Sequence, residues 1–283
     1  PFLRTVGNNV SLPIRSVTTA NMLEEVVGNF DTRSSIDWDK NVNLEILPAL
    51  KKVGGYLALE SVVKKLSFPS LVSIGYLNQP TQTSVSLSFP ELITWTGKQN
   101  LSLNFNNPEI EYNFPKIEKL GLDEPGGVQL GSYMLSHVKG ENINFGKLKE
   151  VSYLGIYQIE NISFPSLMTA KSIQTSLKKE EDNQVKVSIP YLTEVDYIVG
   201  YSLDVPQLTN VIYDIHVGIE TLERMKNLGS VGNYLNIKQV GKVNSQKEYL
   251  DFLPKLRRVG GVVNLEEVET KTLILTSLES VKG

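Results

Sequence analysis

The stretch Phe68-Pro69-Ser70-Leu71-Val72-Ser73-Ile74-Gly75 decides the fold, because its phrase of an apolar residue and then Pro-x-Leu-x-x-Val returns along the whole chain. Other copies of the phrase, or of its first half, begin at Leu47, Phe89, Phe114, Phe164, Ile189, Val205 and Leu253. Degenerate copies at 145–151 and 226–231 have Gly or Lys in the place of the proline. The copies lie about 23 residues apart, and a period of roughly 20 to 50 residues is typical of solenoids and propellers.

Proline shapes each copy, since nine of the thirteen prolines occupy the same slot of the phrase. Proline cannot donate a hydrogen bond to a sheet and favours extended backbone before it, so we expect it to mark a corner of each coil. Alternating apolar and polar residues predict a strand before the corner at 85–89 and 185–189, and one after it at 53–59 and 231–237. One copy cannot bury its apolar face alone, so equivalent strands of stacked copies should pair in parallel. The sequence therefore predicts a mainly β, parallel solenoid of about twelve coils.

Two segments depart from the strand pattern and predict short helical inserts. Residues 18–27 begin with threonines that can cap a helix, and residues 245–253 resemble a capping box that stops at Pro254. The mixed-charge run 178–184 predicts a solvated loop. Trp95 replaces Val in one copy of the phrase, which predicts a core position for this side chain.

Composition narrows the class of protein. The 283 residues carry a net charge of −3 and no cysteine, which leaves no basic field for nucleic acid and no disulfide or thiolate metal site. No apolar stretch reaches the roughly 18 residues of a membrane span, so we expect no membrane insertion of this segment. The chain begins and ends inside a copy of the phrase. Residues 1–283 are therefore expected to be one repeat solenoid and a fragment of a longer protein, whose targeting segment lies outside this sequence.

The run at 68–75 and the pattern Leu-x-x-Val-Gly-x-x-Leu-x-Ile at 228–237 resemble the receptor L-domain family and its leucine-rich-repeat relatives on bacterial and fungal cell surfaces. The resemblance covers nearly the whole chain. It implies a right-handed, leucine-rich-repeat-like β-helix that serves as an ectodomain and binds proteins or other ligands. The absence of cysteine and of the usual asparagine ladder departs from those patterns and favours a bacterial protein that is secreted or held on the outer surface.

Residues suited to catalysis are few. His137 and His216 are the only histidines that could act as bases near neutral pH, and neither has the spacing of a metal-binding pair. Asp196, Asp204 and Asp214 fall on successive coils and are the best candidates for the clustered acids of a polysaccharide-active β-helix enzyme. Solvent-facing structural roles are favoured for all five residues, so we expect no catalytic residue, no cofactor and no metal.

Tyrosines form a column two residues beyond the Val position, at Tyr76, Tyr153, Tyr197 and Tyr213. Equivalent positions on stacked coils lie about 4.8 Å apart, so these side chains should line up. An exposed column would offer flat apolar rings with hydroxyl groups to a glycan or a peptide. Strict alternation from an inward Val would instead turn the tyrosines inward, and we expect this buried or boundary stack.

The resemblance and the scarcity of catalytic residues together favour a non-enzymatic recognition or adhesion module on a bacterial surface. It would bind a protein or a glycan through one sheet face and the variable loops. Exposed aromatic and arginine side chains anchor such contacts, and Tyr191, Tyr201 and Arg258 are the predicted ligand-binding residues. A polysaccharide-active enzyme and a structural spacer or stalk stay open as alternatives. Uncovered strands at the solenoid ends would also favour end-to-end self-association.

Overall fold

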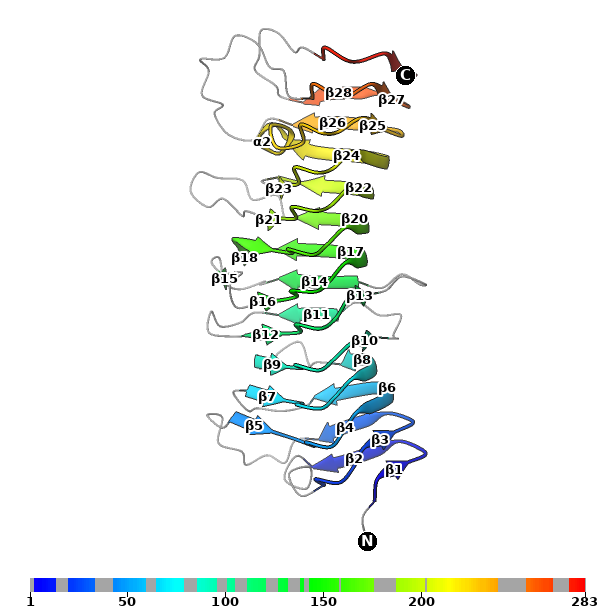
Figure 1. Cartoon of the computed structure of the whole chain (residues 1–283), viewed down its shortest axis with the longest axis vertical. Helices are drawn as coiled ribbons and strands as arrows, with labels where there is room; N and C mark the ends of the chain where they lie inside the picture. Colours follow the sequence, from blue (N-terminus) through cyan, green and yellow to red (C-terminus); the bar gives the residue numbers. More distant parts are fainter. Residues whose placement is uncertain are drawn as a thin grey trace.

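The computed structural model is a long stack of parallel β-strands, wound as a solenoid with its N-terminal and C-terminal coils at opposite ends (Figure 1). The structure describes residues 3–13, 20–33, 43–59, 65–78, 86–95, 101–104, 111–120, 127–131, 138–139, 143–157, 159–175, 187–201, 203–238, 253–266 and 275–282. Every strand pairing among these residues is parallel. The predicted mainly β, parallel solenoid is therefore confirmed.

The strands that follow the corners build two large sheets. The seven-stranded sheet contains β1 (Thr5–Val6), β2 (Val10–Pro13), β3 (Glu25–Val26), β4 (Phe30–Arg33), β6 (Lys52–Leu59), β8 (Ser73–Asn78) and β10 (Thr94–Trp95). The twelve-stranded sheet contains β11 (Leu101–Asn104), β13 (Lys119–Leu120), β14 (Gly127–Gly131), β17 (Glu150–Tyr157), β20 (Thr169–Thr175), β22 (Glu194–Gly200), β24 (Asn210–Gly218), β25 (Ser230–Val231), β26 (Leu235–Lys238), β27 (Arg258–Val259), β28 (Val263–Glu266) and β29 (Ser280–Val281).

The strands that precede the corners build smaller sheets. A five-stranded sheet contains β5 (Asn43–Glu45), β7 (Lys65–Ser67), β9 (Ser86–Ser88), β12 (Tyr112–Asn113) and β16 (Ile143–Asn144). A three-stranded sheet contains β19 (Ile162–Ser163), β21 (Val187–Ser188) and β23 (Leu203–Asp204). A two-stranded sheet pairs β15 (Val138–Lys139) with β18 (Ile159–Glu160). Most coils thus supply one strand before the corner and one after it, as the phrase predicts.

The Val position of the phrase forms an in-register ladder through the large sheets. In the twelve-stranded sheet its eight rungs are Leu120, Val151, Ala170, Val195, Val211, Val231, Val259 and Val281. In the seven-stranded sheet its five rungs are Val6, Val26, Val53, Ile74 and Trp95. The longest unbroken stack therefore has about eight turns. The prediction of about twelve coils counts the copies of the phrase along the whole chain, whereas the ladder divides between the two sheets at β10 and β13, so it differs from the number of turns in one sheet.

The repeated apolar positions fill the core. The Leu positions from Leu23 to Leu256 and the Val positions from Val26 to Val259 are buried. The phenylalanines that precede the corners stack ring on ring, with neighbouring centroids 5.1 to 6.2 Å apart, at Phe68, Phe89, Phe114, Phe145 and Phe164. Trp95 is 8% exposed, which confirms its predicted core position.

The joints between sheets are staggered along the solenoid. The two large sheets meet between β10 and β13, and the five-stranded sheet runs past this joint because β9 pairs with β12 and β12 pairs with β16. The five-stranded and three-stranded sheets meet between β16 and β19, where the twelve-stranded sheet runs on through β17 and β20. Each joint is therefore spanned by a sheet that is continuous there.

The helical insert predicted at 18–27 is wrong over the described residues 20–27. They form a turn and strand β3, because Leu23 and Val26 occupy core positions of the repeat. Residues 18–19, 245–252 and 178–184 lie outside the described residues. Within the described part of the chain the helix is α2 (Ile219–Leu222), where Thr221 Oγ1 accepts a hydrogen bond from the backbone nitrogen of Leu203 at 3.2 Å. This bond covers the edge of the three-stranded sheet.

Candidate functional site

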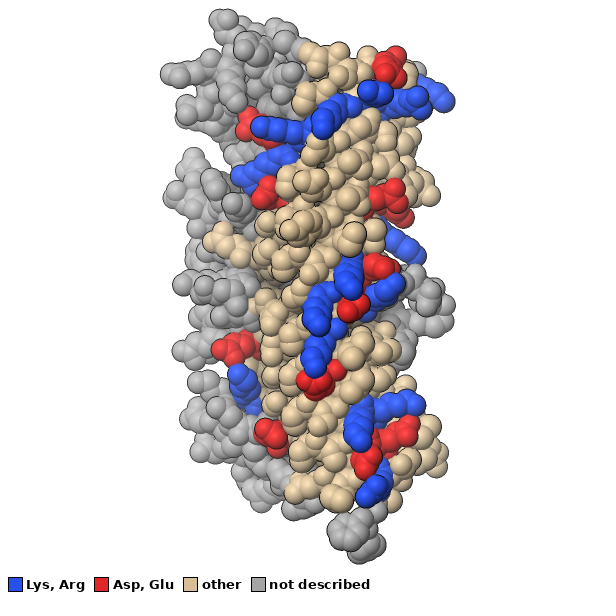
Figure 2. Space-filling view, viewed as in Figure 1, with Lys and Arg blue, Asp and Glu red and all other residues tan. Residues whose placement is uncertain are grey.

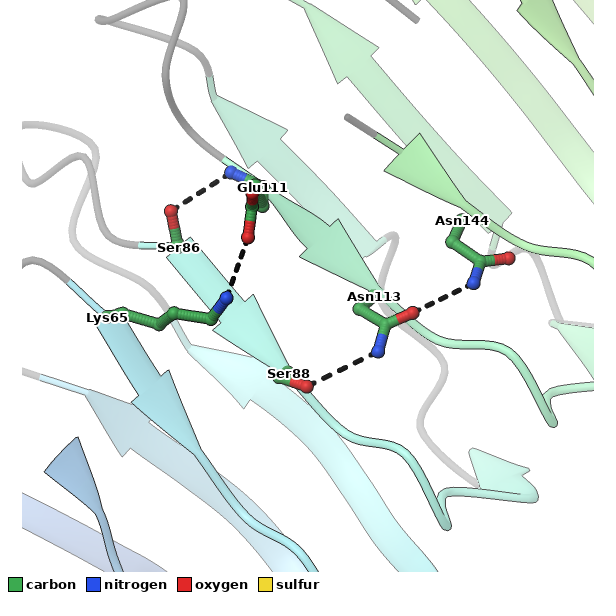
Figure 3. Close-up of polar contacts among 6 residues, drawn as sticks. All are labelled: Lys65, Ser86, Ser88, Glu111, Asn113 and Asn144. Atoms are coloured by element: carbon green, nitrogen blue, oxygen red, sulfur yellow. Dashed lines mark hydrogen bonds and ion pairs between the residues drawn. The ribbon is translucent and has the colours of Figure 1, made fainter. Parts of the chain in front are cut away.

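Outward side chains of the five-stranded sheet form a polar ladder whose members bond one another (Figure 3). Asn144 Nδ2 donates to Asn113 Oδ1 at 2.9 Å, and Asn113 Nδ2 donates to Ser88 Oγ at 3.3 Å. In the neighbouring column Lys65 Nζ reaches Glu111 Oε2 at 2.7 Å, past the coil that lies between them. The hydrogen-bonding groups of these side chains bind one another across neighbouring coils. The polar ladder therefore stabilises the stacking of the coils and has few groups left to bind a ligand.

Charged side chains just after the corner pair across coils in the same way. Lys52 Nζ lies 2.9 Å from Glu25 Oε1, and Lys149 Nζ lies 2.9 Å from Glu118 Oε2. The hydrogen bond from Lys149 is the main reason why the pKa of Glu118 lies below its ordinary value. Figure 2 shows the resulting clusters of mixed charge on the lower and middle coils. These pairs are exposed and serve coil stacking.

A third face, on the strands from β20 to β26, is mostly uncharged and aromatic. Tyr197, Tyr213 and Tyr234 are 41%, 46% and 48% exposed. The rings of Tyr197 and Tyr213 stack with centroids 4.8 Å apart and planes 18° from parallel. Figure 2 shows a broad uncharged area between the charged groups of the middle coils and those of the upper end. We name these three tyrosines, with Gln174 and His216 beside them, the tyrosine-bearing face.

The exposure of Tyr197 and Tyr213 shows that the predicted buried stack is wrong for this pair. The prediction assumed strict alternation after the Val position, but the strand bends there. Val195 and Ile198 are both fully buried, and the register to the next coil shifts between Val195 and Tyr197. Two inward positions separated by two residues push Asp196 and Tyr197 toward the outside. A β-bulge re-aims side chains in this manner.

The two N-terminal tyrosines of the predicted column, Tyr76 and Tyr153, lie at the boundary between core and solvent. Tyr76 is half-buried and packs against Tyr56 at a ring-centroid distance of 5.5 Å. Tyr153 is also half-buried, and its hydroxyl lies 2.6 Å from that of Tyr157 and 3.1 Å from Gln174 Oε1. The Tyr153 ring lies over Gly155, where a Cβ would come within 2.9 Å of the ring carbons. A glycine here lets the ring lie along the sheet.

Polar side chains share a column beside the exposed tyrosines. Strand pairing places Gln174, Val199, His216, Asn236 and Asn264 in register on successive coils. Asn236 Nδ2 donates to Glu266 Oε1 at 3.1 Å, while Asn236 Oδ1 is buried with no hydrogen-bond partner. Amide and imidazole groups can donate and accept. The face therefore combines flat rings with polar groups of both kinds.

The acids near the rings support the face. Asp214 Oδ1 accepts hydrogen bonds from Asn233 Nδ2 at 2.9 Å and from the backbone nitrogen of Tyr234 at 3.1 Å, so it holds the bend of the next coil. Burial raises the pKa of Asp196. Desolvation is the main cause of a raised pKa at the Tyr197 hydroxyl, and Tyr213 and Asp214 add to it. Tyr197 therefore stays a neutral phenol that can donate a hydrogen bond.

The three predicted ligand-binding residues lie on different parts of the solenoid. Tyr191 is 60% exposed at the corner before β22. Arg258 is exposed on β27. Tyr201 directly follows β22, and its ring lies over Gly218 at the border of the tyrosine-bearing face. Of the three, only Tyr201 borders this face, and it is half-buried rather than fully exposed. Tyr234 stands three residues beyond its Val position and not two, so the spacing of the predicted tyrosine column does not include it.

The candidate acids are not gathered at one place. Asp204 belongs to β23 of the three-stranded sheet, whereas Asp196 and Asp214 belong to β22 and β24 of the twelve-stranded sheet. His137 lies outside the described residues, and His216 is exposed on β24. Within the described ranges no group of three metal-ligating side chains could hold an ion. No helix in that part of the chain is long and apolar enough to cross a membrane.

These features define the class of the protein as a parallel β-solenoid with one aromatic outward face. Comparison of the chain with protein-family models, with curated proteins and with solved structures finds no match. The function therefore has to be inferred from the residues of this face.

Proposed function

We propose that this chain is a non-enzymatic recognition module that binds a glycan through the tyrosine-bearing face. We also propose that the solenoid is of the receptor L-domain-like, leucine-rich-repeat type, as the repeated phrase suggests. It would lie on the outer surface of a bacterium, where glycan binding would serve recognition or adhesion.

The stacked and exposed pair of Tyr197 and Tyr213 carries the proposal. Two parallel rings 4.8 Å apart, both more than two-fifths exposed, leave apolar surface in water that contact with a ligand would remove. The C–H faces of a sugar ring fit such a surface, and its hydroxyl groups require donors and acceptors nearby. Gln174 and His216 are exposed on the same side of the sheet and can supply them.

The shape of the site favours an extended ligand. The face crosses several coils, and adjacent coils lie about 4.8 Å apart, which is comparable with the length of one sugar residue. Tyrosine also has few rotatable bonds, so ordering it on a ligand costs little entropy. A polysaccharide chain that lies along the solenoid could therefore contact one coil per sugar.

The test is binding of the chain to an array of purified polysaccharides, followed by calorimetry with the best-binding oligosaccharide. Alanine at Tyr197 or at Tyr213 should weaken binding about tenfold or more, because truncating an anchor residue costs more than about 1.4 kcal/mol. Both side chains are exposed, so the thermal unfolding temperature should change little.

Tyr191→Ala is the matched control, since it removes a tyrosine that is even more exposed but lies at a corner and not on the tyrosine-bearing face. It should leave the affinity unchanged. Loss of binding in Tyr191→Ala with full binding in the other two variants would move the site to the corner. An array on which the chain binds no glycan would reject the proposal.

A further inference from the structure

The C-terminal coils carry a concentration of exposed basic side chains that the tyrosine-bearing face does not use. We name it the basic patch, and its members are Lys226, Lys255, Arg257, Arg258 and Lys282. Figure 2 shows basic side chains running across the upper end of the molecule, with few acids among them. Lys226 also departs from the repeat, because it stands where most copies have proline.

The basic patch differs from equivalent positions on other coils in how its charge is compensated. At the start of β6, Lys52 and the preceding Lys51 face Glu25 and Glu24 of the preceding coil, with Lys51 3.2 Å from Glu24 and Lys52 2.9 Å from Glu25. Arg4 also lies 3.6 Å from Glu24, so three positive charges there meet two carboxylates on neighbouring coils. Such ion pairs link neighbouring coils and leave little net charge on the surface.

At Arg257 and Arg258 this compensation is incomplete. The register neighbours of Arg258 are Ser230 on one side and Ser280 on the other, and neither carries charge. Arg257 has one acidic neighbour, Glu279, with Nε and Oε1 3.8 Å apart. The two arginine side chains thus have one carboxylate among the neighbours that strand pairing gives them.

The corner beside the two arginines adds more positive charge. Lys255 Nζ donates to Asn227 Oδ1 at 2.6 Å, a neutral partner that leaves its charge uncompensated. Lys226 is exposed at the corner of the coil below, and Lys282 is exposed just after β29 on the coil above. Among the residues that the structure describes in these columns, five positive charges on three adjacent coils therefore meet one carboxylate, Glu279.

The basic patch and the tyrosine-bearing face belong to one sheet. Strand β24, which carries Tyr213 and His216, pairs with β25 and with β26, and β25 pairs with β27, which carries Arg258. A ligand that extends along the solenoid from the tyrosines toward the C-terminal coils would meet the arginines next. The guanidinium group binds planar carboxylate and sulfate groups through paired hydrogen bonds.

We infer that the basic patch binds carboxylate or sulfate groups of an acidic polysaccharide, whose chain continues from the tyrosine-bearing face. This inference rests on the proposed function, since it names the chemical class of the same glycan. Charge complementarity decides the class. The net charge of the whole chain is −3, so an anionic ligand is attracted by this local patch and not by the molecule as a whole.

The test compares polymers that share a backbone and differ in charge. The probes are polygalacturonate with its fully methyl-esterified form, and dextran sulfate with dextran. Binding of the chain is measured by affinity gel electrophoresis and calorimetry. We expect the charged member of at least one pair to bind ten or more times tighter at low salt. We also expect this preference to shrink steadily as salt rises, because ions screen exposed charges.

A variant with Arg257→Gln, Arg258→Gln, Lys255→Gln and Lys226→Gln should lose the preference for the charged polymer. The matched control is Lys51→Gln with Lys52→Gln, which removes charges that are compensated on the N-terminal coils, and it should keep the preference. All six residues are exposed, and thermal unfolding verifies that each variant is folded. The salt dependence of the unaltered chain is a second readout that needs no variant.

Equal binding of charged and neutral polymers, or an unchanged preference in the four-site variant, would overturn the inference. If the tyrosine variants then still abolish glycan binding, the proposed function survives that result. Binding of vesicles that contain phosphatidylserine, without binding of either charged polymer, would also overturn it, since the patch would then recognise a membrane surface.

Discussion

Glycine follows the Val position on several coils, at the place where the backbone of the preceding coil comes closest. A Cβ on Gly54 would overlap the carbonyl oxygen of Val27, and one on Gly232 would overlap the carbonyl oxygen of Ile212. These glycines are needed for the close approach of two neighbouring coils, and their dihedral angles are not what requires them. They allow the bend after Val to pass from coil to coil without opening the stack.

Gly232→Ala is therefore expected to lower the free energy of unfolding by about 1–3 kcal/mol, the usual cost of overpacking. The measurement is the denaturant midpoint at constant slope. Gly7→Ala is the control, because a Cβ on Gly7 would meet nothing within 4 Å. It should change the stability by less than about 0.5 kcal/mol. Equal effects at the two positions would contradict the close-approach explanation.

Two acids should change the pH dependence of stability in opposite senses. Burial raises the pKa of Asp196 above its ordinary value of 3.8, so the folded state holds that proton more tightly than the unfolded state. The stability of the chain relative to Asp196→Asn should therefore fall as the pH rises from 3.8 through the folded pKa.

The pKa of Glu118 is lowered from 4.5, chiefly by the hydrogen bond from Lys149. Stability relative to Glu118→Gln should be full above 4.5 and be lost as the pH falls through the folded pKa.

Urea unfolding of the three proteins between pH 3 and pH 7 provides the measurement. Parallel curves for the chain and Asp196→Asn would show that burial does not affect this carboxyl group. A matching result for Glu118→Gln would show that its pair with Lys149 does not form in solution.

Single positions could be predicted from the sequence where they point into the core, and not where the chain bends. The Leu and Val positions and Trp95 are buried as expected. At one corner, however, the copy that begins with Leu47 holds one residue more than the phrase suggests. Ile46 bonds to Ser67 as Phe68 bonds to Ser88, and Leu47 takes up the extra residue with a φ of 50°. The outward turn of Tyr197 has the same origin, since a local bend overrides alternation.

At the scale of elements, the phenylalanines before the corners act as one stack through the core. Phe68, Phe89, Phe114 and Phe145 are separated by 5.1 to 5.3 Å between ring centroids and lie nearly parallel. Each inner ring, such as Phe89, contacts the rings of the coils above and below, so truncating it removes contacts from three coils. The stack therefore couples the five-stranded sheet to the corners that follow it.

Phe89→Ala is expected to lower the free energy of unfolding by about 3–5 kcal/mol, since the side chain is fully buried and leaves a cavity between two rings. The control is Ile93→Ala, four residues further along the chain. It removes an apolar side chain that is 49% exposed, so it should lower the free energy of unfolding far less. Thermal and urea unfolding of both variants make the comparison. Similar losses would mean that the stack adds little to stability.

The elements themselves were predictable to the extent that the repeat governs them. The strands at 86–88 and 187–188 fall inside the segments predicted from alternation, and the strand at 235–238 begins inside the predicted segment 231–237 and ends one residue beyond it. The helix expected at 18–27 fails over residues 20–27, because Leu23 and Val26 are more stabilising as core rungs than as one face of a short helix. Helix α2 was missed, since four residues are too few to show a helical period.

The whole molecule behaves as a one-dimensional stack in which each coil contacts its neighbours. Its terminal strands β1 and β29 pair on one side only within the described residues, whereas β17, β20 and β22 pair on both sides. The ends of such arrays open more easily than the middle. The repeat predicted this architecture, but the number of turns in one sheet and the staggered joints depend on where loops interrupt pairing, which the phrase does not encode.

Hydrogen exchange should therefore show the slowest amide exchange in β17 to β24 and the fastest in β1 and β29. In Phe89→Ala, exchange should accelerate from β6 to β12 while β22 and β24 stay protected, because destabilisation spreads only through neighbouring coils. The readout is mass spectrometry of peptides after pulse labelling under native conditions. Uniform acceleration along the chain would indicate that the solenoid opens as a single cooperative unit.

The staggered joints also determine how the molecule would respond to force. Hydrogen bonds between coils run along the long axis, so stretching acts on them directly. At the joint between β10 and β13, the tension passes to the ladder of β9, β12 and β16, and at the next joint it passes back to β17 and β20. Within the described coils, the resistance to pulling is thus shared along the length of the molecule, because no joint interrupts all of the sheets at the same coil.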